Sequence, residues 1–131
     1  MKFTPNNIVS LKQDEIFVFG SNEAGIHGAG AARVANKSFG AKFGVGFGLV
    51  GQTFAIPTKD HMIRTLPLER INSYVIKFSE ECQKYPNLNF LVTEIGCGLA
   101  GYKPKDIAPM FKNVLAENIC LPATFWKVLN T

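Results

Sequence analysis

The sequence is poor in the residues that build metal sites and disulfide frameworks. It holds only three cysteines, which are widely spaced, and two histidines among 131 residues. An odd number of separated cysteines fits reduced thiols in the cytosol better than a set of disulfides. No zinc-ligand spacing can be written from so few Cys and His residues. We therefore predict a cytoplasmic protein that carries neither a metal nor a cofactor.

Long apolar runs and long basic runs are also missing. No apolar stretch approaches the roughly 20 residues that cross a bilayer, and the first ten residues lack the apolar core of a secretory signal. The net charge of +4 comes from 14 scattered Lys and Arg residues, not from a run typical of nucleic-acid binding. These absences argue against a membrane or specific nucleic-acid partner, while the modest positive charge suits an anionic small molecule.

The chain does have the composition of a compact globular protein. Hydrophobic residues make up 47% of it and charged residues only 18%, whereas disordered chains are poorer in apolar residues. A length of 131 residues is enough for one core and too short for two ordinary domains. We expect residues 1–131 to form a single domain.

Apolar runs and helical periodicities alternate along the chain. Runs typical of buried strands cover residues 15–19, 53–56, 88–95 and 119–121, the first two ending at Gly20 and Pro57. Helical spacing covers 28–39, 67–85, 107–116, with Asp106 as its cap, and 123–129. This order predicts an α/β layered domain with a mostly parallel sheet. Alternate glycines over 40–51 indicate either an irregular hairpin or a mobile loop over a site.

Two glycine-rich turns follow predicted buried strands. They are GSNEAGIHGAGAA, from Gly20 to Ala32, and IGCGLAGY, from Ile95 to Tyr102; below they are called the first and second glycine loops. Glycine lets the backbone approach a ligand closely, and N–H groups at the start of the next helix can hold phosphate oxygens. Two such loops on one sheet predict a diphosphate-bearing ligand held from two sides. Thr58 follows a third strand, at the edge where open α/β sheets place ligand contacts.

Both loops resemble those of one known family. HGAGAARVANKSFG, residues 27–40, resembles the first ligand loop and helix of macrodomains, especially the branch related to the terminal ADP-ribose protein glycohydrolase. TEIGCGLAGY, residues 93–102, resembles the macrodomain phosphate loop, and with FAIPTK at 54–59 the similarity covers about residues 16–121. The resemblance implies a three-layer α/β/α macrodomain-like fold with a mixed, mostly parallel sheet. It also implies a cleft for ADP-ribose, free or attached to a target protein.

The resemblance places particular residues against that ligand. Asn22 would lie beside the distal ribose, and the second glycine loop would wrap the diphosphate from the side opposite Gly28. Tyr102 either borders the ligand or packs beneath its loop. The full set of predicted ligand-binding residues is Ser21, Asn22, Gly28, Ala29, Gly30, Thr58, Gly96, Cys97, Gly98, Leu99, Ala100, Gly101 and Tyr102.

The sequence departs from the glycohydrolase branch where the chemistry lies. An aspartate follows I-G-C-G-L in that branch, and here the position is Ala100, which has no acid or base function. The branch also has a nucleophilic lysine. Lys42 and Lys59 lie near its expected place in the sequence, and the motif does not identify either of them as the match. We therefore expect ligand binding, with weak hydrolase activity at most.

Three loop residues are candidates for that residual chemistry. Asp60, His27 and Glu23 each lie on a loop at a strand end, where a side chain can orient a water molecule. The structural alternatives are a turn cap for Asp60 and a packed side chain for His27. Cys97 is either an activated thiol at a helix start or a small, partly buried loop residue.

Three functions from different classes remain open on the sequence. The first is an ADP-ribose-binding module with weak hydrolase activity. The second is an enzyme that uses the same loops on another phosphorylated nucleotide or sugar. The third is a protein-interaction module whose cleft is filled by Phe47 or Tyr102. Phe43, Phe47 and Phe54 either wall an adenine pocket or belong to the core.

Overall fold

The computed structural model describes residues 2–131 and is built on a five-stranded sheet of order β2-β3-β1-β4-β5. The strands are β1 (Glu15–Asn22), β2 (Gly48–Val50), β3 (Thr53–Lys59), β4 (Asn89–Val92) and β5 (Ile119–Cys120). β1 pairs in parallel with β3 and β4, and β4 with β5, whereas β2 runs antiparallel to β3. The predicted α/β class with a mixed, mostly parallel sheet is confirmed.

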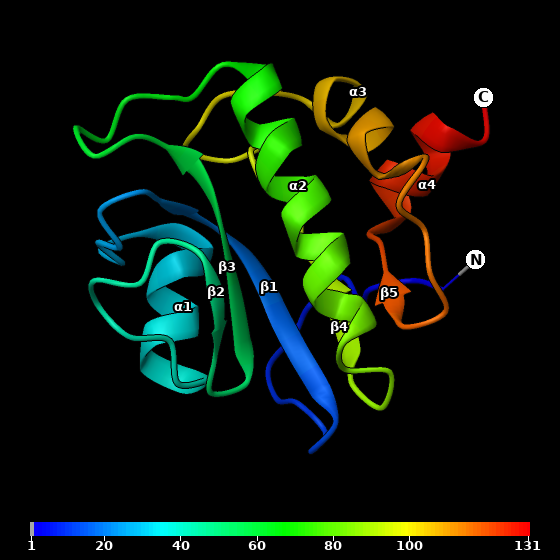
Figure 1. The fold of residues 1–131 in the computed structure, drawn as a ribbon, viewed down its shortest axis with the longest axis horizontal. Helices are drawn as coiled ribbons and strands as arrows, with labels where there is room; N and C mark the ends of the chain where they lie inside the picture. The colour runs from blue at the N-terminus through cyan, green and yellow to red at the C-terminus, as the bar shows by residue number, and fades with distance from the viewer. Residues whose placement is uncertain (1) are drawn as a thin grey trace.

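Helices lie on both faces of this sheet (Figure 1). They are α1 (Gly30–Ser38), α2 (Leu68–Gln83), α3 (Pro104–Ile107) and α4 (Ala123–Leu129), with a 3-10 turn η1 (Ala108–Phe111). Successive β1 residues point to opposite faces, so Val18 packs into the larger core with α2 while Phe19 packs into the smaller core with α1. None of the helices within residues 2–131 is long and apolar enough to cross a membrane.

The larger core explains why α2 forms where the sequence predicts it. Ile71, Val75, Phe78 and Cys82 recur on one face of the helix and are fully buried. Phe78 meets Phe54 of β3 edge to face, with ring centroids 4.9 Å apart, a geometry that adds about 1 kcal/mol to the burial of the rings. The helices predicted at 28–39 and 123–129 are likewise present as α1 and α4.

Two strands run further than the sequence predicts. β1 continues through Gly20 to Asn22, and β3 continues through Pro57 to Lys59. Pro57 has no N–H to donate to a neighbouring strand. It is tolerated because β2 pairs with β3 only as far as Ala55, so no partner strand on that side needs a hydrogen bond from residue 57. These extensions carry both strands up to the cleft described below.

The helix predicted over 107–116 is wrong. The chain forms the single turn α3 before it and then η1, because Pro109 cannot donate the backbone hydrogen bond that a continuing helix needs. Asp106 lies inside α3 rather than ahead of a helix, and its carboxylate accepts a hydrogen bond of 3.0 Å from the Lys103 N–H. The strand predicted over 88–95 is also shorter and ends at Val92.

The glycine-rich segment 40–51 is an irregular loop that supports the first glycine loop and ends in β2, which forms a hairpin with β3. The Gly44 N–H donates to the Gly25 carbonyl at 2.9 Å. A Cβ on Gly25 would lie 2.4 Å from the Gly44 backbone, and a Cβ on Gly46 would lie 2.5 Å from the Asn22 carbonyl oxygen. Glycine is therefore needed here so that two backbones can touch.

Candidate functional site

The topology leaves a crevice between β1 and β4. These strands are neighbours in the sheet, yet the helix that follows β1 packs on one face and Ile107 of α3, which follows β4, packs on the other. The two connecting loops consequently diverge at the carboxyl ends of the strands. Open α/β sheets bind ligands at such a switch point.

A cleft of about 420 Å³ occupies this crevice. It is lined by the first glycine loop and the start of α1, by the second glycine loop, and by the turn after β3. The lining residues are Gly20, Ser21, Asn22, Ile26, Gly28, Ala29, Gly30, Ala31, Ala32, Thr58, Lys59, Ile63, Thr93, Glu94, Ile95, Gly96, Gly98, Leu99 and Ala100. Most of the residues predicted to bind a ligand therefore lie in one hollow.

The first wall of the cleft is the amino-terminal end of α1. Ala29 precedes the helix in an extended conformation, no side chain caps the helix, and its first turn contains no acidic residue. The N–H groups of an uncapped first turn lack intrahelical partners and carry a partial positive charge. Gly28 has no other atom within 4 Å of where a Cβ would lie. This wall offers backbone hydrogen-bond donors with open space at Gly28, while the Leu99 side chain lies 3.5 Å from where a Cβ on Gly30 would be.

The second wall is the second glycine loop. Within the described chain, the N–H groups of Gly98, Leu99 and Ala100 donate to no other backbone group. Gly98 again has open space where a Cβ would lie, whereas Gly96 has φ +76° and would place a Cβ 2.9 Å from Ile107. Gly96 is thus needed for the loop conformation, and Gly98 keeps the cleft open.

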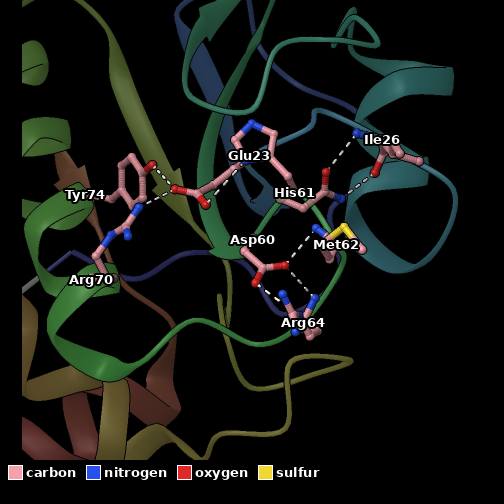
Figure 2. Close-up of polar contacts among 9 residues, drawn as sticks. Glu23, Ile26, Asp60, His61, Met62, Arg64, Arg70 and Tyr74 are labelled. Carbon is pink, nitrogen blue, oxygen red and sulfur yellow. Dashed lines mark hydrogen bonds and ion pairs between the residues drawn. The ribbon is translucent and has the colours of Figure 1, made fainter.

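The third wall is the turn over residues 59–65. Asp60 accepts hydrogen bonds from the N–H groups of Met62 and Arg64 at 2.8 and 3.0 Å (Figure 2), and these bonds lower the pKa of its carboxyl. The turn places Ile63 on the cleft at φ 62°, a strained value for a β-branched residue. Asp60 does not line the cleft, and its contacts are those of a turn cap.

Two hydrogen bonds tie this turn to the second glycine loop. The Thr65 hydroxyl donates to the Ala100 carbonyl at 2.9 Å, and the Tyr102 hydroxyl donates to the Leu66 carbonyl at 2.7 Å. Tyr102 packs against the larger core rather than on the cleft. Its packing interpretation is therefore the one that the structure favours, and Gly101 beside it lies outside the lining as well.

The polar side chains of the cleft floor are partly engaged with the protein. The Asn22 amide bonds to both the carbonyl and the N–H of Ile26, at 2.8 and 3.0 Å, and so shapes the first glycine loop. The Ser21 hydroxyl donates to the Gly46 carbonyl, and that of Thr58 donates to the Ser21 carbonyl at 3.3 Å. Because an amide nitrogen has two hydrogens, Asn22 keeps one donor beyond the bond to Ile26.

Two candidate reactive groups lie outside the cleft lining. His27 is 2% exposed and packs between Phe19 and Phe43, with ring centroids 5.3 and 5.7 Å away. Burial lowers its pKa, an effect that the Val45 backbone opposes. Cys97 packs against the larger core, and burial, with Glu94 and Asp106 nearby, raises its pKa to about 12. Neither is placed to react with a molecule in the cleft.

Glu23 is committed to a contact between the first glycine loop and α2. Its carboxylate accepts hydrogen bonds from Tyr74 and Arg70, both at 2.5 Å, while His61 approaches it at 3.8 Å (Figure 2). The Glu23 side chain is only 12% exposed. This cluster ties the first glycine loop to α2 and leaves Glu23 outside the cleft lining.

Two charged residues line the cleft in addition to those predicted to bind a ligand. Lys59 lines the cleft and Lys42 does not. The sequence signal for Lys59 is its position at the carboxyl end of a strand, where open α/β sheets place ligand contacts. Glu94 also lines the cleft, two residues beyond the end of β4. Its only signal in the sequence is its place between a buried strand and the second glycine loop.

A second hollow of about 320 Å³ adjoins the cleft. Ala31, Thr93 and Glu94 line both. The remaining lining residues are Thr4, Pro5, Asn6, Ile8, Phe17, Val34, Pro122, Ala123 and Thr124. Thr4 is 5% exposed, and its hydroxyl has no hydrogen-bond partner in the described chain. A hollow with a mixed polar and apolar lining thus continues the glycine-lined cleft.

The phenylalanines do not wall either hollow, except for Phe17 in the second. Phe54 is fully buried, Phe47 packs on it and on Tyr74, and Phe43 covers His27. Neither Phe47 nor Tyr102 fills the cleft. The core interpretation holds for Phe54 and for Phe47, which packs against the core, whereas Phe43 is 64% exposed and belongs neither to the core nor to the cleft lining.

The fold and the site together define an α/β domain with a glycine-lined cleft at the carboxyl ends of its parallel strands. Among residues 2–131, no group of three or more His, Cys, Asp or Glu side chains is arranged to hold a metal ion. The chain matches no protein-family model, no curated protein and no solved structure.

Proposed function

We propose that this chain is a macrodomain-like α/β/α domain that binds ADP-ribose, free or attached to a target protein, across the two glycine loops. One observation carries the proposal. The uncapped start of α1 lines the same cleft as Gly98, Leu99 and Ala100, whose N–H groups donate to no other backbone group in the described chain. Backbone N–H groups on two sides of a cleft suit a diphosphate, because they bind its oxygens without a bulky cation.

The two ends of the cleft suit the two ends of the ligand. The second hollow, which Ile8, Phe17 and Val34 help to line, would take the adenine. At the other end, Asn22 and Lys59 would lie beside the distal ribose. Ligand pockets of about 300 to 1,000 Å³ are usual, and the cleft and the hollow together lie within that range.

The cleft supports binding more strongly than hydrolysis. Ala100 lines the cleft where the resemblance would place a catalytic acid, and Asp60, His27 and Glu23 lie outside the lining. Lys59 does line the cleft, and the branch uses a nucleophilic lysine, but the aspartate that the branch also has is replaced here by Ala100. We propose that hydrolysis of ADP-ribosyl bonds, if measured, is slow compared with ligand exchange.

Calorimetric titration with ADP-ribose tests this function. We expect saturable binding, and a rise in melting temperature at millimolar ligand, since a ligand at 100 times its Kd stabilises the native state by about 2.7 kcal/mol. AMP and ribose 5-phosphate, which each lack half of the ligand, should bind more weakly. Absence of heat and of a melting shift with millimolar ADP-ribose would overturn the proposal. Tighter binding of another nucleotide would favour the alternative in which the two loops serve another phosphorylated nucleotide or sugar.

A further inference from the structure

Glu94 occupies the junction of the two hollows. It lines the glycine cleft on one side and the second hollow on the other, together with Thr93 and Ala31. It is the only acidic residue in the lining of either hollow within the described chain. A ligand that spans both hollows must pass beside its carboxylate.

The Glu94 carboxylate is held in place from the far side. Its Oε2 accepts a hydrogen bond of 2.6 Å from the Thr124 hydroxyl, in the first turn of α4. Glu94 is solvent-exposed. An ionised carboxylate only accepts hydrogen bonds and has several acceptor sites, and the bond to Thr124 uses one of them. The remaining sites are available to donors on a ligand.

The part of ADP-ribose between its diphosphate and its base is a ribose with two hydroxyl groups. Resting on the proposed function, we infer that Glu94 accepts hydrogen bonds from this ribose and so selects ADP-ribose over its 2′-phosphorylated form. The physical reason is twofold. A free hydroxyl donates a hydrogen bond to the carboxylate, whereas an ionised 2′-phosphate has no hydrogen to donate. The phosphate also places about two negative charges beside the negative charge of the Glu94 carboxylate. Dinucleotide-binding folds use an acidic residue at the ribose in the same way.

The charge of Glu94 sets the size of the expected selectivity. A pair of unit charges about 4 Å apart interacts appreciably even in water, and more strongly near a protein surface. With a phosphate of nearly two charges, we expect ADP-ribose to bind about tenfold or more tightly than ADP-ribose 2′-phosphate. Glu94→Gln removes the charge and keeps an oxygen that accepts from Thr124. It should bind ADP-ribose several-fold more weakly and the 2′-phosphate several-fold more tightly.

Titration of both ligands into the wild type and two variants tests the inference. Glu94→Gln is compared with Glu117→Gln, an exposed acid just before β5, at the opposite end of the sheet from the cleft. Opposite changes for the two ligands in Glu94→Gln, with Glu117→Gln like the wild type, would support the role of Glu94. This pattern cannot come from misfolding, because misfolding weakens both ligands.

Each other outcome has a definite meaning. Equal binding of the two ligands by the wild type, or a parallel loss of both in Glu94→Gln, overturns the selectivity while leaving ADP-ribose binding intact. Wild-type protein that binds neither ligand overturns the proposed function and this inference together. Tighter binding of the 2′-phosphate by the wild type would show that cations dominate the junction, and it would also overturn the inference.

Discussion

The sharpest prediction concerns the different roles of two glycines in one loop. Gly98 faces open space, with no atom within 4 Å of where a Cβ would lie and no left-handed backbone angle. We expect Gly98→Val to fold normally, with a free energy of unfolding within about 0.5 kcal/mol of the wild type, as for other surface substitutions. We expect the same variant to lose ADP-ribose binding, because the added methyl groups stand in front of the loop N–H groups.

The expected loss follows from contact distances. A phosphate oxygen must come within about 2.9 Å of a backbone nitrogen to accept its hydrogen bond, whereas carbon atoms keep other atoms about 3.5 Å away. A valine side chain at position 98 therefore holds the phosphate off the loop. A hydrogen bond to a charged group contributes about 1.5 to 3 kcal/mol, so losing one such bond raises the Kd roughly ten- to a hundredfold.

Gly96 supplies the matched contrast within the same loop. It has φ +76°, and a Cβ there would lie 2.9 Å from Ile107. Gly96→Ala should lower the melting temperature, because the left-handed conformation alone costs an L-residue about 1 to 2 kcal/mol. Ala116→Val, on an exposed turn, controls for added bulk. Calorimetric titration together with thermal unfolding measures both quantities, and wild-type affinity in Gly98→Val would refute a ligand held by this loop.

Two further predictions concern His27 and Ile63. Because burial lowers the pKa of His27 below its usual 6.5, the unfolded chain binds its proton first, and stability should fall as pH drops through about 6.5. Melting curves should show this fall, and His27→Phe should reduce it; an unchanged slope in the variant would assign it to other groups. Ile63→Gly relieves the strain at φ 62°, so its melting temperature should match or exceed that of the wild type. It should bind ADP-ribose several-fold more weakly, because Ile63 lines the cleft; unchanged affinity would remove Ile63 from the binding surface.

The glycine loops serve two structural purposes that look alike in the sequence. Gly25 and Gly46 allow backbone segments to touch within the protein, whereas Gly28 and Gly98 leave space in the cleft. The sequence cannot separate these roles, because both require only that a side chain be missing. The distinction depends on what lies opposite each glycine, which is a property of the packed chain.

The sequence by itself determined the α/β class, the mostly parallel sheet and the glycine loops, because local apolar runs and helical spacing carry that information. It also determined α2, whose buried face repeats along the length of the helix. It did not determine where β1 and β3 end, since Pro57 is tolerated only because β2 stops pairing at Ala55. Tertiary structure alone decided which residues share the cleft. Burial beside Phe19 took His27 out of it, and the divergence of the loops after β1 and β4 brought Glu94 into it.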